Sequence, residues 1–187
     1  VASVDDSRFP LVEAVFTADE SGRPLANLAP SELSITEGGS PATVTALRSA
    51  SDASMPLALL VTFDTSGSMA GASLAQAKAA ASALFRSLSP GDVGGLITFS
   101  DGVQVAVPLG GSRAELEAAV QGLQANGNTA LYDAVAQSGK LAAGSGLARR
   151  AVVLFSDGED YGGLSGLSRA QSLQAAAGGD ALIFVIG

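Results

Sequence analysis

Cysteine, histidine and tryptophan are all absent from this 187-residue chain. Without cysteine, there is no disulfide framework, no thiolate nucleophile and no cysteine-bound zinc. Without histidine, there is no Ser-His-Asp triad and no imidazole ligand for a metal. Basic residues are scarce as well, because 10 Lys and Arg against 18 Asp and Glu give a net charge of −8. This balance argues against a nucleic-acid partner, because binding a phosphate backbone requires clustered Lys and Arg.

Long apolar runs are absent too. The run at residues 56–63 is about the longest, far short of the ~18 residues that a membrane span requires, so we expect no span in this segment. Aromatic residues make up only 5% of the chain, but hydrophobic residues reach 47%. At roughly 100–200 residues per domain, this composition is sufficient for one domain with its own core, or for one domain and a smaller segment.

The organisation of the chain changes near residue 50. Before it, the sequence predicts a β-rich segment at residues 1–50, and small polar residues at 49–55 predict a linker. The expected elements are strands at 9–17, 34–37 and 42–47, turns at 19–24 and 38–39, and one helical turn at 30–33. These strands are too few for an independent β-sandwich of about seven.

From residue 56 onward, apolar strand patterns alternate with helical patterns. Apolar runs predict strands at 57–63, 93–99, 151–155 and 182–186. Helical periodicity predicts helices at 73–88, 112–123, 129–141 and 164–176. Residues 103–107 alternate in polarity, which predicts a half-exposed edge strand ended by Pro108. This order predicts an α/β fold with a doubly wound sheet.

Oxygen-bearing side chains follow two of the predicted strands. Asp64 ends the first strand and is followed by Ser66 and Ser68, Asp157 ends a later strand, and Thr129 lies where a helix begins. Open α/β sheets bind their ligands at the carboxyl ends of strands. Two carboxylates and three hydroxyls suit Mg²⁺, Mn²⁺ or Ca²⁺ rather than zinc or copper. Such a cation would attract one more anionic oxygen, for which a partner's Asp or Glu is the natural candidate.

Taken singly, these residues also have ordinary structural interpretations. Asp64 and Ser66 suit the cap of the following helix, and so does Thr129. Asp157 followed by glycine is typical of a turn. The metal site is favoured by their combination in order at the ends of the expected elements.

At these residues, over about 56–187, the sequence resembles the von Willebrand factor A (VWA) domain. The metal-ion-dependent adhesion site of that family combines an Asp-x-Ser-x-Ser element with a distant Thr and a distant Asp. All five occur here, as Asp64, Ser66, Ser68, Thr129 and Asp157. The resemblance implies a Rossmann-like, mostly parallel sheet with one antiparallel edge strand, which we assign to 103–107.

The resemblance also implies how the site would work. Asp64, Ser66 and Ser68 would hold Mg²⁺ or Mn²⁺ directly or through water, while Thr129 and Asp157 would alternate between direct and water-mediated contact. The family normally continues with another helix and strand, so we expect the domain at 56–187 to lack them. In some surface proteins an A domain interrupts a β-sandwich, and we expect residues 1–50 to be part of such a split sandwich.

The leading functional hypothesis is a non-enzymatic adhesion or assembly module of a bacterial surface or extracellular protein. A protein ligand would offer an Asp or Glu to the metal. The alternative is an intracellular VWA scaffold in a chelatase-like or ATPase-associated complex. We expect no enzymatic activity. Asp64-Thr65 resembles the start of the aspartic-protease Asp-Thr-Gly motif, but Ser66 intervenes, and there is no phosphate-binding Gly-rich loop with its Lys.

Overall fold

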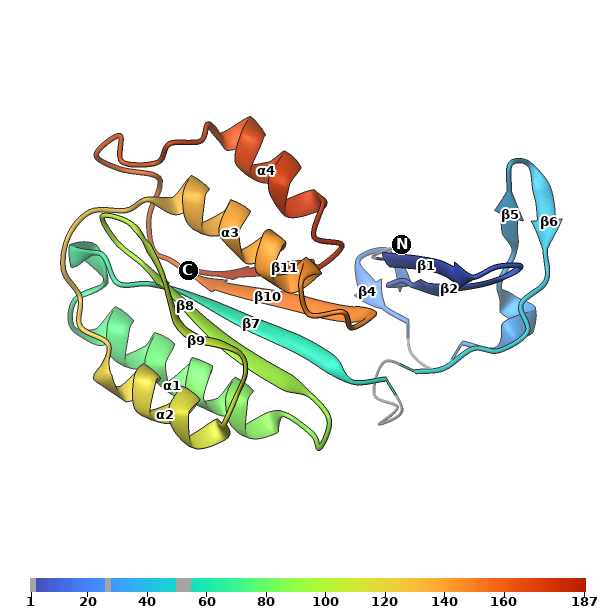
Figure 1. The fold of residues 1–187 in the computed structure, drawn as a ribbon, viewed down its shortest axis with the longest axis horizontal. Coiled ribbons are helices and arrows are strands. Elements are labelled where there is room, and N and C mark those ends of the chain that lie inside the picture. Colours follow the sequence, from blue (N-terminus) through green and yellow to red (C-terminus); the bar gives the residue numbers. More distant parts are fainter. Residues whose placement is uncertain (1–2, 26–27, 50–54) are drawn as a thin grey trace. The chain divides into compact units, whose positions relative to one another are not determined.

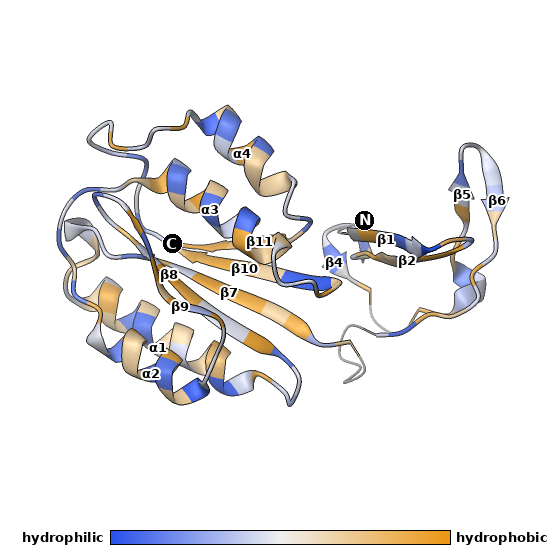
Figure 2. Cartoon of the chain, viewed as in Figure 1, coloured by the Kyte–Doolittle hydropathy of each residue, from blue (hydrophilic) through white to orange (hydrophobic). Residues whose placement is uncertain are grey.

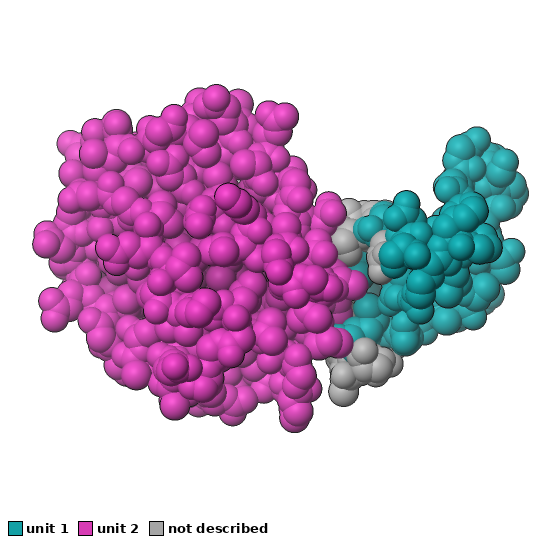
Figure 3. Space-filling view, viewed as in Figure 1, with its two compact units in different colours: residues 1–55 teal, residues 56–187 magenta. Residues whose placement is uncertain are grey.

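The computed structural model describes residues 3–25, 28–49 and 55–187 (Figure 1). The chain forms two compact units, Val1–Met55 and Pro56–Gly187, which Figure 3 colours separately. Most of the expected linker, residues 50–54, lies outside the described residues. Whether the first unit belongs to a split sandwich stays a prediction.

Short hairpins make up the first unit. Strand β1 (Ser3–Arg8) pairs with β2 (Leu11–Val15), β3 (Asp19–Glu20) with β4 (Arg23–Pro24), and β5 (Ile35–Glu37) with β6 (Ser40–Ala42), all antiparallel. A 3₁₀ turn at Pro30–Glu32 matches the expected helical turn. The strand expected at 9–17 is shorter, because Phe9 and Pro10 form the turn of the first hairpin. The strand expected at 42–47 was wrong, since pairing ends at Ala42.

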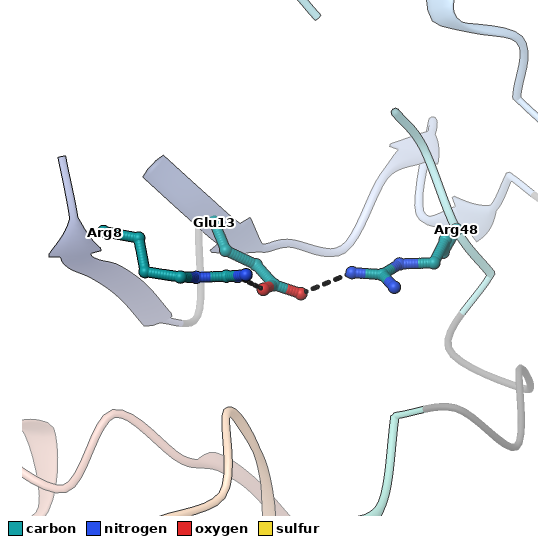
Figure 4. Close-up of polar contacts among 3 residues, drawn as sticks. All are labelled: Arg8, Glu13 and Arg48. Atoms are coloured by element: carbon teal, nitrogen blue, oxygen red, sulfur yellow. Dashed lines mark hydrogen bonds and ion pairs between the residues drawn. The ribbon is translucent and has the colours of Figure 1, made fainter. Parts of the chain in front are cut away.

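One carboxylate links the ends of the first unit. Glu13 accepts hydrogen bonds from the guanidinium groups of Arg8 at 2.8 Å and Arg48 at 3.0 Å (Figure 4). Both arginine side chains are exposed, so each ion pair contributes only about 0.2–1 kcal/mol. The contacts nevertheless tie the segment after β6 to the first hairpin.

The second unit is built on a five-stranded sheet in the order β11-β10-β7-β8-β9. Its strands are β7 (Leu57–Asp64), β8 (Val93–Phe99), β9 (Val103–Gly111), β10 (Arg149–Phe155) and β11 (Leu182–Ile186). Every neighbouring pair is parallel except β8 and β9. The prediction of a mostly parallel sheet with one antiparallel edge strand is therefore confirmed.

Helices cover both faces of this sheet (Figure 1). Helices α1 (Ala72–Ser87) and α2 (Arg113–Gly122) lie on one face, and α3 (Leu131–Ala143) and α4 (Arg169–Ala177) lie on the other. Across residues 3–25, 28–49 and 55–187, no helix has both the length and the apolar character to cross a membrane.

Alternation along the central strand creates a core on each face. Val61 and Phe63 are fully buried against the α1–α2 side, where Phe85 packs, whereas Leu60 faces Ala142 of α3. Figure 2 shows the same pattern as an apolar band along the strands beneath more polar outer helix surfaces. The fully apolar runs in the sequence arise because β7 and its neighbours are buried on both faces.

Gly94 at the start of β8 has a packing role. A Cβ at this position would lie 2.7 Å from Leu116 Cδ1 and 3.0 Å from Leu88 Cδ1. Glycine therefore lets α1 and α2 lie close to the sheet, which explains why a weak strand former stands inside a buried strand.

The largest boundary differences from the predictions in the second unit are at β9 and α4. Strand β9 does not end at Pro108 but continues to Gly111, with irregular pairing to β8 around Leu96 that accommodates the proline on this edge strand. Helix α4 begins at Arg169 rather than 164. Ser168 caps it, because its Oγ accepts a hydrogen bond from Gln171 N and its N donates to Gln171 Oε1.

The predicted capping box of α2 is present. Ser112 Oγ accepts a hydrogen bond from Glu115 N at 3.2 Å, and Ser112 N donates to Glu115 Oε2 at 2.8 Å. Ser112 Oγ also donates to Glu115 Oε2 at 2.8 Å. The two bonds to the carboxylate, first from the Ser112 side chain and then from its backbone, hold the pKa of Glu115 below its ordinary value. A carboxylate with a lowered folded-state pKa stabilises the fold above the unfolded pKa, and this contribution is lost as pH falls through the folded-state pKa.

We therefore expect Ser112→Ala to lower the free energy of unfolding by about 1 kcal/mol, the usual cost of a lost N-cap. This difference in the free energy of unfolding should be smaller in acid, because protonated Glu115 no longer accepts the strong hydrogen bonds that Ser112 donates to its charged carboxylate. Urea unfolding of both proteins at neutral and acidic pH measures this. A deficit that is independent of pH would contradict the link to Glu115.

Candidate metal centre

Four loops meet at the carboxyl end of β7 and its neighbours. The turn after β7 is tied to the end of β8, because Thr65 N donates to Phe99 O at 2.8 Å. The loop before α3 joins the same turn through Gly67 N, which donates to Gly127 O at 2.9 Å. The loop after β10 joins it through Asp157, as described next. The edge predicted to bind a ligand is thus a real convergence of loops.

Four of the five predicted site residues form one hydrogen-bonded chain. Asp64 is fully buried, and its Oδ1 accepts from Ser66 N at 2.8 Å. Ser66 Oγ and Ser68 Oγ lie 3.0 Å apart, and Ser68 Oγ donates to Asp157 Oδ1 at 2.9 Å. A short 3₁₀ turn at Gly67–Met69 brings the two hydroxyls to the same side. Residues 89 positions apart in the sequence are thereby in direct contact.

Thr129 enters the site through its backbone. It is buried, and its carbonyl accepts a hydrogen bond from Tyr161 N at 3.0 Å, which links it to the loop that carries Asp157. Within the described part of the chain, the Thr129 side chain forms no hydrogen bond with the other four predicted residues. Thr129 is also not the residue that caps α3, because the helix begins after Ala130.

Ser156 is a site residue that the sequence prediction missed. Its Oγ donates to Asp64 Oδ2 at 2.6 Å, so both carboxylate oxygens of the buried Asp64 are hydrogen-bonded. The feature that identifies Ser156 is the register of the sheet, in which Phe155 of β10 pairs with Phe63 of β7. The next residues, Ser156 and Asp64, are then neighbours. Finding this from the sequence would have required knowing that β10 lies beside β7.

The loops around these residues carry one sign of charge. Residues 64–71, 99–104, 124–133 and 156–168 contain no Lys or Arg. Their acidic residues are Asp64, Asp101, Asp133, Asp157, Glu159 and Asp160. Among the residues that the structure describes, no three carboxylates gather as a ready-made metal cage. A cation here would depend on hydroxyl ligands as well as on Asp64 and Asp157, in a field that attracts positive charge.

Solved structures share this fold. A von Willebrand factor type A protein from Catenulispora acidiphila matches with a TM-score of 0.60 and 24% identity, over 70% of this chain and 33% of that one. The vWF domain of the type V pili tip protein Mfa5 from Porphyromonas gingivalis matches with a TM-score of 0.54 and 20% identity, over 57% of this chain and 39% of that one. The chain thus spans well under half the length of these two structures.

An aerotolerance-related membrane protein from Bacteroides fragilis, with multiple mutations to serines, has the same fold at a TM-score of 0.58 and 18% identity, over 70% of this chain and 67% of that one. No curated protein sequence matches. The family model for the von Willebrand factor type A domain matches residues 59–159, more than half of the chain, and this match contains all five predicted site residues. The chain therefore belongs to the von Willebrand factor type A domain family.

Proposed function

We propose that Asp64, Ser66, Ser68, Thr129 and Asp157 hold a divalent cation, Mg²⁺ or Mn²⁺ with Ca²⁺ as a further candidate. In this proposal the domain uses the cation to bind a protein partner. The single observation that carries the proposal is the row of hydrogen-bonded oxygens from the buried Asp64 through two serines to Asp157.

The spacing of these oxygens fits the preferred geometry of magnesium. In an octahedron with metal–oxygen distances of about 2.0–2.1 Å, neighbouring oxygens lie about 2.9 Å apart. The Ser66 Oγ–Ser68 Oγ distance is 3.0 Å and the Ser68 Oγ–Asp157 Oδ1 distance is 2.9 Å. The donor set contains only oxygen, as a hard cation prefers. The residues at this edge therefore fit the proposed ion.

The chain's own residues prepare the site. Asp64 is held by Ser66 N and by Ser156 Oγ, which fix the orientation of its carboxylate. Hydrogen bonds that orient a metal ligand in this way typically change metal affinity. When bound, the ion would provide a positive centre for an anionic oxygen from outside the chain. Because three of the five proposed ligands are neutral hydroxyls, the ion would stay Lewis acidic enough to bind one more anionic oxygen, for which a partner's Asp or Glu is the candidate.

The acidic residues on the loops around the site, here called the rim, restrict which partners can bind. The surrounding loops carry Asp101, Glu159 and Asp160 without any Lys or Arg, so they repel an isolated acidic segment. We expect the partner's Asp or Glu to be flanked by basic residues. Tyr161, 71% exposed beside this rim, offers a contact surface for such a segment.

We propose an adhesion or assembly role in a bacterial surface or extracellular protein, in preference to an intracellular scaffold. A pilus tip protein among the solved structures with this fold supports that choice. We also propose that the domain is not an enzyme. The chain has no His or Cys, and the proposal assigns Asp64 and Asp157 to the cation rather than to proton transfer.

Metal binding should stabilise the fold. At a free Mn²⁺ or Mg²⁺ concentration about a hundredfold above the Kd, the free energy of unfolding should rise by about 2.7 kcal/mol, and the Tm by about 5–10 °C. Thermal unfolding with added MnCl₂ and with EDTA measures the shift. The control is NaCl at matched ionic strength, because screening of the net charge also stabilises. An equal rise in NaCl would contradict specific binding.

Partner binding should depend on both the ion and a carboxylate. We expect peptides selected from a random display library in Mg²⁺ to contain Asp or Glu near Lys or Arg. Their binding should be lost in EDTA and when that acidic residue is changed to its amide. Binding that survives both changes would contradict the proposed recognition.

A further inference from the structure

Helix α3 takes its N-terminal cap from a distant loop. Its own N-cap residue is Ala130, which has no side chain able to accept a hydrogen bond from the first turn. Free N–H groups at a helix N-terminus require partners. Two of them are satisfied by the loop after β10, because Tyr132 N donates to Asp160 Oδ1 at 3.3 Å and Asp133 N donates to Ser165 Oγ at 3.4 Å.

The helix holds that loop in return. Asp133 accepts two backbone hydrogen bonds from it, Gly166 N to Oδ2 at 2.9 Å and Leu167 N to Oδ1 at 3.0 Å. Within the loop, Ser165 Oγ donates to Asp160 Oδ1 at 2.5 Å, which connects the two sets of bonds. Each partner thus contributes a carboxylate that binds the backbone of the other.

These reciprocal bonds lie immediately beside two proposed metal ligands. Thr129 lies four residues before Asp133, and Asp157 lies three residues before Asp160. Tyr161 N donates a hydrogen bond to Thr129 O, which directly joins the loop after β10 to the segment before α3. Hydrogen bonds to charged groups are among the stronger ones, and negative charge is favoured at a helix N-terminus.

We infer that Asp133 and Asp160 act as positioning residues, which join the start of α3 and residues 156–168 into one cooperative unit and so fix Thr129 against Asp157. The consequence for the cation rests on the proposed function. The coupling of the two segments does not, because it is a property of the protein without any metal.

Amide hydrogen exchange of the full chain, measured by NMR, tests the coupling. Asp133→Asn retains the shape of the side chain but leaves its NH₂ group facing a backbone N–H. Exchange should become about tenfold faster or more at whichever of Gly166 and Leu167 faces that NH₂ group, because that N–H loses its acceptor. If the segments are coupled, exchange should also become faster at Tyr132 and Tyr161. Faster exchange at Gly166 and Leu167 alone would overturn the inference.

Two further variants complete the test. Asp160→Asn weakens the bonds that the loop makes to the start of α3. It should accelerate exchange at Gly166 and Leu167, although neither residue bonds to Asp160. Asp92→Asn is the matched control, because its carboxylate also accepts two backbone bonds, from Leu57 N and Ser89 N at 2.8 Å each, but at the other end of β7. It should leave exchange near the site unchanged.

Titration with Mn²⁺ tests the consequence for the cation. Asp133→Asn should weaken Mn²⁺ binding about tenfold or more, the usual effect of losing a group that positions a metal ligand, while Asp92→Asn should leave it at the wild-type value. Wild-type affinity in Asp133→Asn would overturn the positioning role. A wild-type protein that binds no Mn²⁺ would instead overturn the proposed function and, with it, the positioning role, and the exchange data would still decide the coupling.

Discussion

Asp64→Ala should abolish measurable binding of Mg²⁺ and Mn²⁺, with a loss of affinity of at least about a hundredfold. Outer-shell changes alone typically cost metal sites about 10–100-fold, and this substitution removes a charged ligand outright. It also releases the bonds from Ser66 N and Ser156 Oγ that orient the buried carboxylate. The remaining hydroxyls and Asp157 offer too little negative charge to hold a strongly hydrated cation. Isothermal titration calorimetry measures the effect.

Glu159→Gln is the matched control. It removes a carboxylate from the same rim, but Glu159 is exposed and lies outside the hydrogen-bonded row. Glu159 should contribute only to the negative electrostatic potential around the site, so the Kd for the metal should change by less than about fivefold. Equal losses in the two variants would mean that the rim attracts cations without a defined site. Unchanged affinity in Asp64→Ala would remove Asp64 from the site.

Gly139→Leu should destabilise the second unit by about 3 kcal/mol, the upper end of the usual cost of overpacking. Gly139 lies where α3 crosses α4, and a Cβ there would come within 2.5 Å of Ala176 Cα and 2.9 Å of Ala176 O. Both atoms belong to the backbone, so they can yield only if α4 moves away from α3. Urea unfolding followed by circular dichroism measures the change.

Gly122→Leu is the control for that substitution. Gly122 ends α2 with no atom within 4 Å of the position of an added Cβ. Leucine favours a helix over glycine by up to about 1 kcal/mol, so this variant should be neutral or slightly more stable. If both variants were destabilised equally, the loss at Gly139 would come from the exchange of glycine for leucine itself, not from the close approach of α4.

The sequence predicts the core of the fold well because the central strands are buried on both faces. The apolar runs at 57–63, 93–99 and 151–155 alternate with helical patterns along the chain. In that order they are typical of buried parallel strands and have few other interpretations. The convergence of Asp64 and Asp157 is predictable for the same reason, because Asp64 follows one such run directly and Asp157 follows another after Ser156. Parallel strands bring their carboxyl ends to one edge, so the two residues converge without any knowledge of the loops.

What the sequence does not predict depends on tertiary contacts. Strand β1 (Ser3–Arg8) is polar and carries no alternating pattern, so only its pairing with β2 defines it. The start of α4 was placed five residues early, because apolar Leu164 and Leu167 precede the capping Ser168. Asp133 lies in the first turn of α3, where acidic residues are common and indicate no special role. Its role emerges only from the loop that lies against it.

We propose that one divalent cation lies among the oxygens at the carboxyl end of β7. Anomalous scattering from crystals soaked in Mn²⁺ tests it most directly, because the peak locates the metal without reference to function. We predict a single strong peak among the proposed ligands Asp64, Ser66, Ser68, Thr129 and Asp157. A peak at the rim carboxylates alone, or no peak at saturating Mn²⁺, would mean that these five residues do not form a cation site.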